Sequence, residues 1–313
     1  MRTPRIAVGL GTAIALMSLA ACGGSDNNND VFATGSSSSS SSSGGGSSIT
    51  VGSANFPESV LLANIYAGAL KAKGVDVTTK LNIGSREAYI PALQDGSIDL
   101  IPEYTGVLAQ YFDKSAKATD SEGVYKELQA ALPAELTVLD KSAAEDKDSV
   151  AVTKATADKL QLKSIADLQG KSKDLVLGGP PEWKTRETGV PGLKKVYGLE
   201  FKSFRPLDAG GPLSVQALKN GQVDAANIFT TDPSIPANSF VVLEDPKSLF
   251  AAQNVVPLAT KAKVNDTVSG ALNAVSAKLD TKTLTDLLSQ VVTDKKDPDA
   301  VAQEWLKSNG LGG

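Results

Sequence analysis

Two features of the composition limit the chemistry that this chain can perform. The chain contains no His and one Cys, Cys22. The lack of His excludes Ser-His-Asp and Cys-His catalysis and His metal sites, and one Cys cannot form an intrachain disulfide or a thiolate zinc cluster. A carboxylate-only enzyme with acids such as Glu58 or Glu103 stays open. We expect instead a protein that binds a small molecule, without metal or cofactor, and is not an enzyme.

The overall charge argues against a nucleic-acid partner. The chain has 31 basic and 35 acidic residues, a formal net charge of −4, so it carries no strongly basic footprint. Hydrophobic residues make up 41% and charged residues 21% of the 313 positions, as in ordinary globular proteins of one or two domains.

A repeated motif indicates which elements position the polar residues. Residues 92–99 read ALQDGSID and residues 217–224 read ALKNGQVD, and both fit the pattern A-L-x-x-G-x-[I/V]-D. In this pattern the Gly ends a helix in a left-handed conformation and the Ile or Val begins the next strand. We interpret the repeat as two α/β units, one in each of two lobes. The alternative is a chance match, because helix-Gly-strand is a common local pattern.

Both units direct their strand ends and helix starts toward one region. We expect strands to end near Tyr104 and near Phe229, and helices to begin at Ser85 and at Gly211. Ligands of open α/β sheets lie beyond the carboxyl ends of the strands, where helix N-termini present free N–H groups. Two facing units would therefore form a cleft for a small molecule.

The first 48 residues lack the pattern of a folded domain. Arg2 and Arg5 precede an apolar run over residues 6–21, which is short for a membrane span and typical of a signal peptide. The run ends in Leu-Ala-Ala-Cys, which resembles the lipobox of bacterial lipoproteins and predicts lipidation of Cys22 and anchoring to the cell membrane. The alternatives are an ordinary secretory signal or a core helix. Residues 22–48, rich in Gly, Ser and Asn, predict a disordered tether.

The rest of the chain divides into two lobes in our interpretation. Lobe 1 comprises residues 49–152 and 255–313, and lobe 2 comprises residues 153–254. A strand over residues 149–153 leaves lobe 1 and a strand over residues 254–259 returns to it, which predicts a two-strand hinge. A helical tail over residues 268–309 packs on lobe 1.

Several motifs in order resemble the glycine betaine, choline and osmoprotectant-binding proteins of ABC importers. They are GSANFPES, LNIGSREAYIPALQDGSIDLIPEYTG, LGGPPEW, LDAGGPLSVQALKNGQVDAANIFTTDPSI and NVVPLA, between Ile49 and Asn309. The resemblance implies a type II periplasmic-binding-protein fold, a monomer, an osmoprotectant ligand, and an ABC permease with its ATPase as partners.

The resemblance also implies how the ligand is held. In that family, aromatic rings surround a quaternary ammonium by cation–π attraction, and basic or hydroxyl groups hold a carboxylate. Tyr104 matches a ring donor of the family, and Phe229 falls where members often have Tyr. Arg186 fits the position that holds the carboxylate. Phe56 and Tyr89 are further ring candidates.

Four positions depart from the family pattern. Ala54 replaces a basic residue, and Val107 replaces a hydroxyl residue. Asp148, in the segment 145–148, and Gln253 stand where other members have aromatic rings. An uncharged, polyol-like or aromatic ligand is therefore an alternative, as is a cation paired with Asp148 or Asp232.

The predicted ligand-binding set combines ring, hydroxyl, amide and charged side chains: Asn55, Phe56, Ser85, Tyr104, Thr105, Asp148, Arg186, Asp208, Gly211, Phe229, Thr230, Asp232 and Gln253. For Arg86 we expect a structural ion pair with Glu87 or Asp99. A lipid-anchored hydrolase that uses carboxylates and a sensory binding domain are the rival functions.

Overall fold

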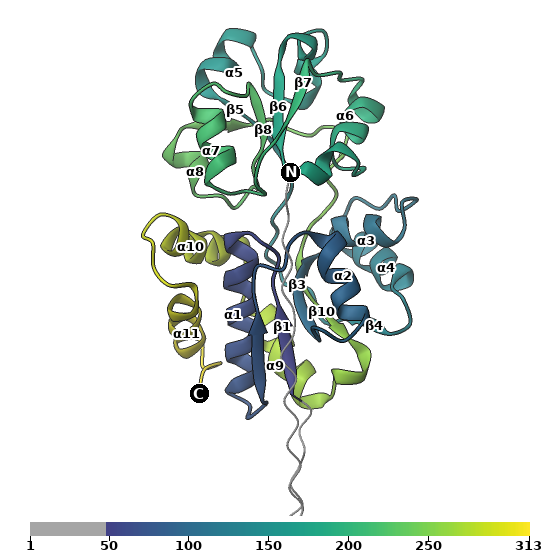
Figure 1. The fold of residues 1–313 in the computed structure, drawn as a ribbon, viewed down its shortest axis with the longest axis vertical. Coiled ribbons are helices and arrows are strands. Elements are labelled where there is room, and N and C mark those ends of the chain that lie inside the picture. The colour runs from purple at the N-terminus through teal and green to yellow at the C-terminus, as the bar shows by residue number, and fades with distance from the viewer. Residues whose placement is uncertain (1–47) are drawn as a thin grey trace, which may run out of the picture. The chain divides into compact units, whose positions relative to one another are not determined.

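Two five-stranded sheets form the framework of the fold (Figure 1). The computed structural model describes residues 48–313. The first sheet has the order β2-β1-β3-β10-β4. Its strands are β1 (Ile49–Gly52), β2 (Val77–Lys80), β3 (Leu100–Tyr104), β4 (Leu136–Val138) and β10 (Val255–Thr260). We call this sheet and the helices around it the first lobe.

The helices of the first lobe come from both ends of the described chain. They are α1 (Pro57–Lys71), α2 (Arg86–Gln94), α3 (Thr105–Phe112), α4 (Ser121–Ala131), α9 (Asp266–Ser276), α10 (Thr281–Val292) and α11 (Pro298–Ser308), with a short 3₁₀ helix at Lys261–Lys263. Apolar and small residues occur all around α1, and the helix is buried between the sheet and the three C-terminal helices α9, α10 and α11. The helical tail therefore packs on the first lobe, as expected.

The second sheet has the order β7-β6-β8-β5-β9. Its strands are β5 (Val150–Thr153), β6 (Val176–Gly179), β7 (Ser203–Pro206), β8 (Ala225–Asn227) and β9 (Phe240–Val242). With it lie α5 (Lys154–Leu160), α6 (Val190–Tyr197), α7 (Pro212–Lys219) and α8 (Ser234–Ala237), and the 3₁₀ helices Ile165–Leu168, Ser172–Asp174 and Pro181–Lys184. In each sheet the central strands are parallel and one strand from a distant part of the chain runs antiparallel. This is the topology of the type II periplasmic-binding-protein fold.

Two segments connect the lobes, one between β4 and β5 and one between β9 and β10. They meet at an antiparallel bridge between Glu145 and Asn254. The position of β5 differs from our expectation that this strand leaves lobe 1 and that lobe 1 ends at residue 152. Because β5 pairs with β8 and β9, residues 150–152 belong to the second sheet, and the crossing occurs before them.

The repeated motif forms the same turn in both lobes. Gly96 ends the turn after α2 with φ +78°, and Gly221 ends the turn after α7 with φ +66°. A Cβ would strain both positions, which explains why the motif requires Gly there.

The repeated Asp makes the same contacts in both lobes. In the first lobe the Asp99 carboxylate accepts the N–H of Thr50 at 2.8 Å, and its own N–H donates to the Thr50 carbonyl at 2.8 Å. In the second lobe Asp224 bonds both backbone groups of Val176 in the same way, at 2.8 and 2.9 Å. The motif therefore joins a helix–strand unit to the neighbouring parallel strand.

The predicted signal peptide, the lipidated Cys22 and the Gly/Ser tether to residue 47 lie outside the described residues. Within residues 48–313, every helix is too short or too polar to cross a membrane.

Candidate functional site

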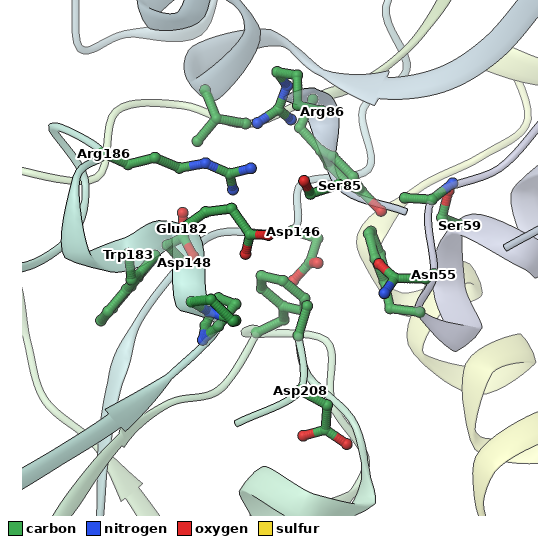
Figure 2. A pocket seen from close by; sticks show the side chains of 18 of the residues that line it. Asn55, Ser59, Ser85, Arg86, Asp146, Asp148, Glu182, Trp183, Arg186 and Asp208 are labelled. Carbon is green, nitrogen blue, oxygen red and sulfur yellow. The ribbon is translucent and has the colours of Figure 1, made fainter. Parts of the chain in front are cut away.

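A cavity of about 290 Å³ lies between the two lobes, at the carboxyl ends of β1, β3, β6 and β8 (Figure 2). Both lobes and both connecting segments contribute to its wall. The lining residues are Ala54, Asn55, Phe56, Ser59, Ser85, Arg86, Tyr89, Pro102, Tyr104, Val107, Asp146, Asp148, Pro180, Pro181, Glu182, Trp183, Arg186, Leu207, Asp208, Ala209, Phe229 and Gln253.

The structure brings nine of the thirteen predicted binding residues to this cavity: Asn55, Phe56, Ser85, Tyr104, Asp148, Arg186, Asp208, Phe229 and Gln253. The other four, Thr105, Gly211, Thr230 and Asp232, do not line it. All four lie close to lining residues in the sequence, and each has a local structural contact instead.

Two of these four residues hold the connecting segments. The Thr105 hydroxyl donates to the Ala252 carbonyl at 3.2 Å and accepts the N–H of Asn254 at 3.1 Å. The Thr230 hydroxyl accepts the N–H of Lys147 at 2.9 Å. These hydroxyls join each lobe to a connecting segment rather than facing a ligand.

The other two lie beside the N-termini of short helices. Gly211 is the residue before α7, and the Asp208 carboxylate next to it accepts the N–H groups of Leu213 and Ser214 at 2.9 and 2.7 Å. Asp208 therefore lines the cavity, but its carboxylate caps α7. The Asp232 carboxylate accepts the N–H of Ser234 at 2.7 Å in a turn outside the cavity.

An aromatic cluster of three rings lies on the wall of the cavity. Phe56, the residue before α1, lies 6.2 Å from Tyr104 at the end of β3 and 5.3 Å from Phe229 beyond β8, measured between ring centroids. Phe56 and Tyr104 belong to the first lobe and Phe229 to the second. Phe56, only a further candidate from the sequence, thus joins the two principal ring candidates.

Glu58 fixes the position of Tyr104. The Tyr104 hydroxyl donates to one Glu58 carboxylate oxygen at 2.6 Å, and the hydroxyl of Thr231 donates to the other at 2.5 Å. Both glutamate oxygens are therefore bonded, and the second lobe contacts α1 directly through Thr231. The same contacts fix the position of the Tyr104 ring beside the cavity.

A second buried carboxyl group lies beside Glu58. Asp146 accepts the N–H of Thr231 at 3.1 Å, and only 3% of its surface is exposed. Burial, followed by the negative charge of Glu58, holds the pKa of Asp146 well above its usual range. Burial also raises the pKa of Glu58, against the hydrogen bonds from Thr231 and Tyr104. The negative charge of Glu58 therefore favours the protonated form of Asp146.

A buried ion pair supports the wall on the side of the first lobe. Arg86 binds both carboxylate oxygens of Glu103, with N–O distances of 2.6 and 2.7 Å, and the Tyr89 hydroxyl donates to the same carboxylate at 2.7 Å. Burial opposes the charge on Arg86, but Glu103 raises its pKa, so the guanidinium stays protonated. Our expectation that Arg86 pairs with Glu87 or Asp99 was wrong.

Glu87 instead pairs with Arg186, and this pair spans the cleft. The two N–O distances are 2.8 and 3.2 Å, and the Ser85 hydroxyl donates to the same carboxylate at 2.7 Å. Partial burial opposes the charge of Glu87, but the hydrogen bonds from Arg186 and Ser85 lower its pKa to about 2. Since Arg186 belongs to the second lobe and Glu87 to the first, opening of the cleft must break this pair.

The connecting segments supply a polar wall. One Asp148 carboxylate oxygen accepts the Asn227 amide N–H at 2.9 Å. Burial raises the pKa of Asp148, against the effects of Asn227 and Arg186. Gln253 lies on the second connecting segment and is 3% exposed. Asp148 and Gln253 are the two positions at which the sequence has a polar residue where the family pattern predicts an aromatic ring.

Several side chains that line the cavity were not predicted from the sequence, chiefly Ser59, Asp146, Glu182 and Trp183. The last two lie in the motif LGGPPEW, whose Gly-Pro-Pro turn after β6 was the available signal. Asp146 lies two residues before Asp148 on the connecting segment. Ser59 carries no such signal, since its hydroxyl accepts the Ala54 N–H within the turn before α1.

Comparisons with known proteins agree with this architecture. A family model, OpuAC, described as the substrate binding domain of ABC-type glycine betaine transport systems, matches residues 47–308. The glycine betaine-binding protein YehZ of Escherichia coli (strain K12) is 28% identical over 279 residues, which cover 84% of this chain and 91% of the relative. The carnitine transport binding protein OpuCC of Listeria monocytogenes is 28% identical over 281 residues, covering 84% and 87%.

Solved structures show the same fold. The crystal structure of a glycine betaine/carnitine/choline ABC transporter protein matches with a TM-score of 0.67 and 26% identity, and covers 84% of this chain and 99% of that chain. Lactococcal OpuAC, in a closed form with glycine betaine, matches with a TM-score of 0.60 at 15% identity, over 84% and 96% of the two chains. The second likeness supports the fold alone.

Proposed function

The chain belongs to the OpuAC family of substrate-binding domains of ABC-type glycine betaine transport systems, and we propose that its cavity captures a small quaternary ammonium osmolyte. The observation that carries this proposal is the aromatic cluster, whose three rings from two lobes lie on one cavity. The face of an aromatic ring attracts a cation with about 0.5–2 kcal/mol when the site is desolvated. A methylated ammonium is a cation that can be held in this way without hydrogen bonds.

The cleft acts as a hinged clamp in this proposal. Phe56 and Tyr104 move with the first lobe and Phe229 with the second, so a ligand contacts all three rings only when the lobes are closed. Because the ligand has more contacts in the closed form, it shifts the population toward that form. The Arg186–Glu87 pair stabilises the same form.

The loaded protein then delivers its ligand to a permease and its ATPase on the extracytoplasmic side of the membrane, where the binding proteins of importers act. We further propose that Cys22 carries a lipid anchor and that the protein is a monomer.

We propose no catalytic role for the acidic residues. Glu58 and Glu103, the acids considered for a hydrolase, each have both carboxylate oxygens bonded by neighbouring side chains. A binding role accounts for these groups as supports of the cavity wall.

Ligand-induced thermal stabilisation of the full-length protein in mild detergent tests the function. The panel would contain choline, glycine betaine, carnitine, ectoine, polyols, sugars and aromatic compounds. A ligand at a hundredfold over its Kd adds about 2.7 kcal/mol to the free energy of unfolding, which shifts Tm by several degrees. Stabilisation by a sugar or polyol, with none by any quaternary ammonium, would refute the proposed ligand class.

The variant Tyr104→Ala tests the aromatic cluster itself. We expect its affinity for the stabilising quaternary ammonium to fall roughly threefold to thirtyfold, because one ring face is lost. The matched control is Tyr111→Ala, since Tyr111 is 36% exposed and lies outside this cavity. Unchanged affinity in Tyr104→Ala would remove the aromatic cluster from the site.

A further inference from the structure

The basic residues that line the cavity are already paired with acidic residues. Two arginines line it, Arg86 and Arg186, and each already binds both oxygens of a carboxylate outside the cavity, Glu103 and Glu87 respectively. A ligand carboxylate therefore meets guanidinium groups whose charge is already neutralised. With Ala54 in the wall as well, the cavity offers no unpaired cation among the described residues that line it.

In contrast, two acidic residues that line the cavity form no ion pair with other described residues. Asp148 is 8% exposed, forms no ion pair within residues 48–313, and has Asn227 and Trp183 as its hydrogen-bonding side-chain neighbours. Glu182 is half-buried, lines the same cavity and has no side-chain hydrogen bond or ion pair in the described chain. Both carboxyl groups can face a cation without first breaking an ion pair.

Two buried amide side chains near Asp148 also have polar atoms without a hydrogen-bond partner within residues 48–313. Gln253 is 3% exposed and lines the cavity, yet its carboxamide forms no hydrogen bond with any described residue. The carboxamide oxygen of Asn227, which donates its N–H to Asp148, also has no partner in the described part of the chain. Buried polar groups normally have partners, because a buried group without one has lost its hydrogen bonds to water and gained none in exchange. Asp148 and Gln253 therefore mark a polar part of the cavity, distinct from the aromatic cluster.

We propose that the ligand of this cavity is a net cation with an O–H or N–H donor, of the choline type, rather than a zwitterion with a carboxylate, and that Asp148 and Gln253 determine this preference. The inference rests on the proposed function. The aromatic cluster receives the methylated ammonium, and the donor of the ligand reaches a carboxylate oxygen of Asp148 or the amide oxygen of Gln253. The negative charge of Asp148 balances the net charge of the ligand in a site of low dielectric constant.

Calorimetric titration of the full-length protein with four matched probes tests the preference. Choline has both the charge and the O–H donor, tetramethylammonium has only the charge, 3,3-dimethyl-1-butanol has only the donor, and glycine betaine has a carboxylate in place of the donor. We expect choline to bind most tightly and each of the others to bind about tenfold or more weakly, since each of them lacks the net charge, the hydrogen-bond donor or both. Glycine betaine binding as tightly as choline or more so would overturn the inference and leave the proposed function intact.

Two variants assign the preference to residues. Asp148→Asn should weaken choline about tenfold or more and reduce the ratio of choline to glycine betaine affinity. Gln253→Met, similar in volume, should weaken choline several-fold and leave tetramethylammonium unchanged, because only choline carries the donor. An unchanged affinity ratio in Asp148→Asn would overturn the role of this residue.

Asp294→Asn is the matched control, because it makes the same change of a carboxylate to an amide at an exposed position outside the cavity. It should change the choline affinity less than about threefold, as is typical of exposed charges. An effect as large as that of Asp148→Asn would show a general effect of charge and overturn the specific contact. If a folded protein binds none of the four probes, nor any other quaternary ammonium, the proposed function fails and this inference fails with it.

Discussion

The two copies of the repeated motif differ in what they place at the cleft. Their backbone contacts match, because Asp99 and Asp224 each bond both backbone groups of a neighbouring parallel strand. Positions 125 residues apart correspond, so Tyr104 matches Phe229 and both rings pack against Phe56. The motif thus builds a scaffold that brings one ring to the cavity from each lobe.

The residue before each ring shows the difference. In the first lobe Glu103 is bonded by Arg86 and Tyr89, so the polar groups behind Tyr104 are satisfied within the lobe. In the second lobe the equivalent residue is Ile228, fully buried in an apolar cluster. One scaffold therefore tolerates either an ion pair or an aliphatic side chain behind the ring. The ligand is discriminated elsewhere, on the connecting segments.

The largest expected effect on stability comes from the residue before the ring in the first lobe, Glu103. Glu103→Gln leaves Arg86 as a buried charge without a charged partner, which should lower the free energy of unfolding by about 3–5 kcal/mol. The equivalent change in the second lobe, Ile228→Val, removes one methylene group and should cost about 1 kcal/mol. Urea denaturation of both variants measures the two values. Equal losses would mean that the ion pair is no more important than ordinary packing.

A smaller loss of stability, equal in the two lobes, is expected when the Asp of either repeat is replaced. Asp99→Ala and Asp224→Ala each remove the acceptor of a backbone N–H, and each should lower the free energy of unfolding by about 1–3 kcal/mol. Asp99 also lies 3.4 Å from the ammonium group of Lys263. Lys263→Ala serves as the control for this contact, with an expected loss below about 1 kcal/mol. A loss at only one of the two Asp positions would contradict their equivalence.

Another prediction concerns the buried carboxyl groups of Glu58 and Asp146, which both accept hydrogen bonds from Thr231 of the second lobe. The pKa of Glu58 and the pKa of Asp146 are raised in the folded state, chiefly by burial. The folded protein therefore binds these protons more tightly than the unfolded chain does, and stability falls as the pH rises from about 4 toward neutrality. Glu58→Gln removes one charge and should flatten this decline by on the order of 1 kcal/mol between pH 5 and pH 7. Urea midpoints at several pH values for both proteins measure the slopes, and parallel slopes would contradict the raised pKa of Glu58.

Local patterns in the sequence were sufficient to predict the scaffold. The left-handed Gly96 and Gly221, the strand end at Tyr104 and the strand end two residues before Phe229 depend on residues within about ten positions of each other. A helix–turn–strand unit is specified by such short-range spacing, and the same spacing placed both rings at one cleft.

Contacts between distant residues were not predictable in this way. Arg86 pairs with Glu103 across 17 residues rather than with its neighbour Glu87, because adjacent side chains on a helix point in different directions. The bond between Glu58 and Thr231 joins residues 173 positions apart in different lobes. No periodicity records such a pair, since it depends on how the lobes pack.

The smallest expected effect on stability comes from the ion pair that spans the cleft. Arg186 and Glu87 are 26% and 48% exposed in their side chains, so a double-mutant cycle of Arg186→Ala and Glu87→Gln should give a coupling energy of at most about 1 kcal/mol, which decreases at high salt. The pKa of Glu87 is lowered to about 2, so the contribution is present above its ordinary pKa and is lost only as the pH falls toward 2. The exposed pair Lys154–Asp158 is the control, because it lies within α5 and does not change when the cleft opens.

Small-angle scattering of ligand-free Arg186→Ala should then show a larger radius of gyration than the unmodified protein, because the Arg186–Glu87 pair opposes opening of the cleft. An unchanged radius, with a coupling energy equal to that of the α5 pair, would make it an ordinary surface pair and leave Glu58 and Thr231 to hold the lobes together.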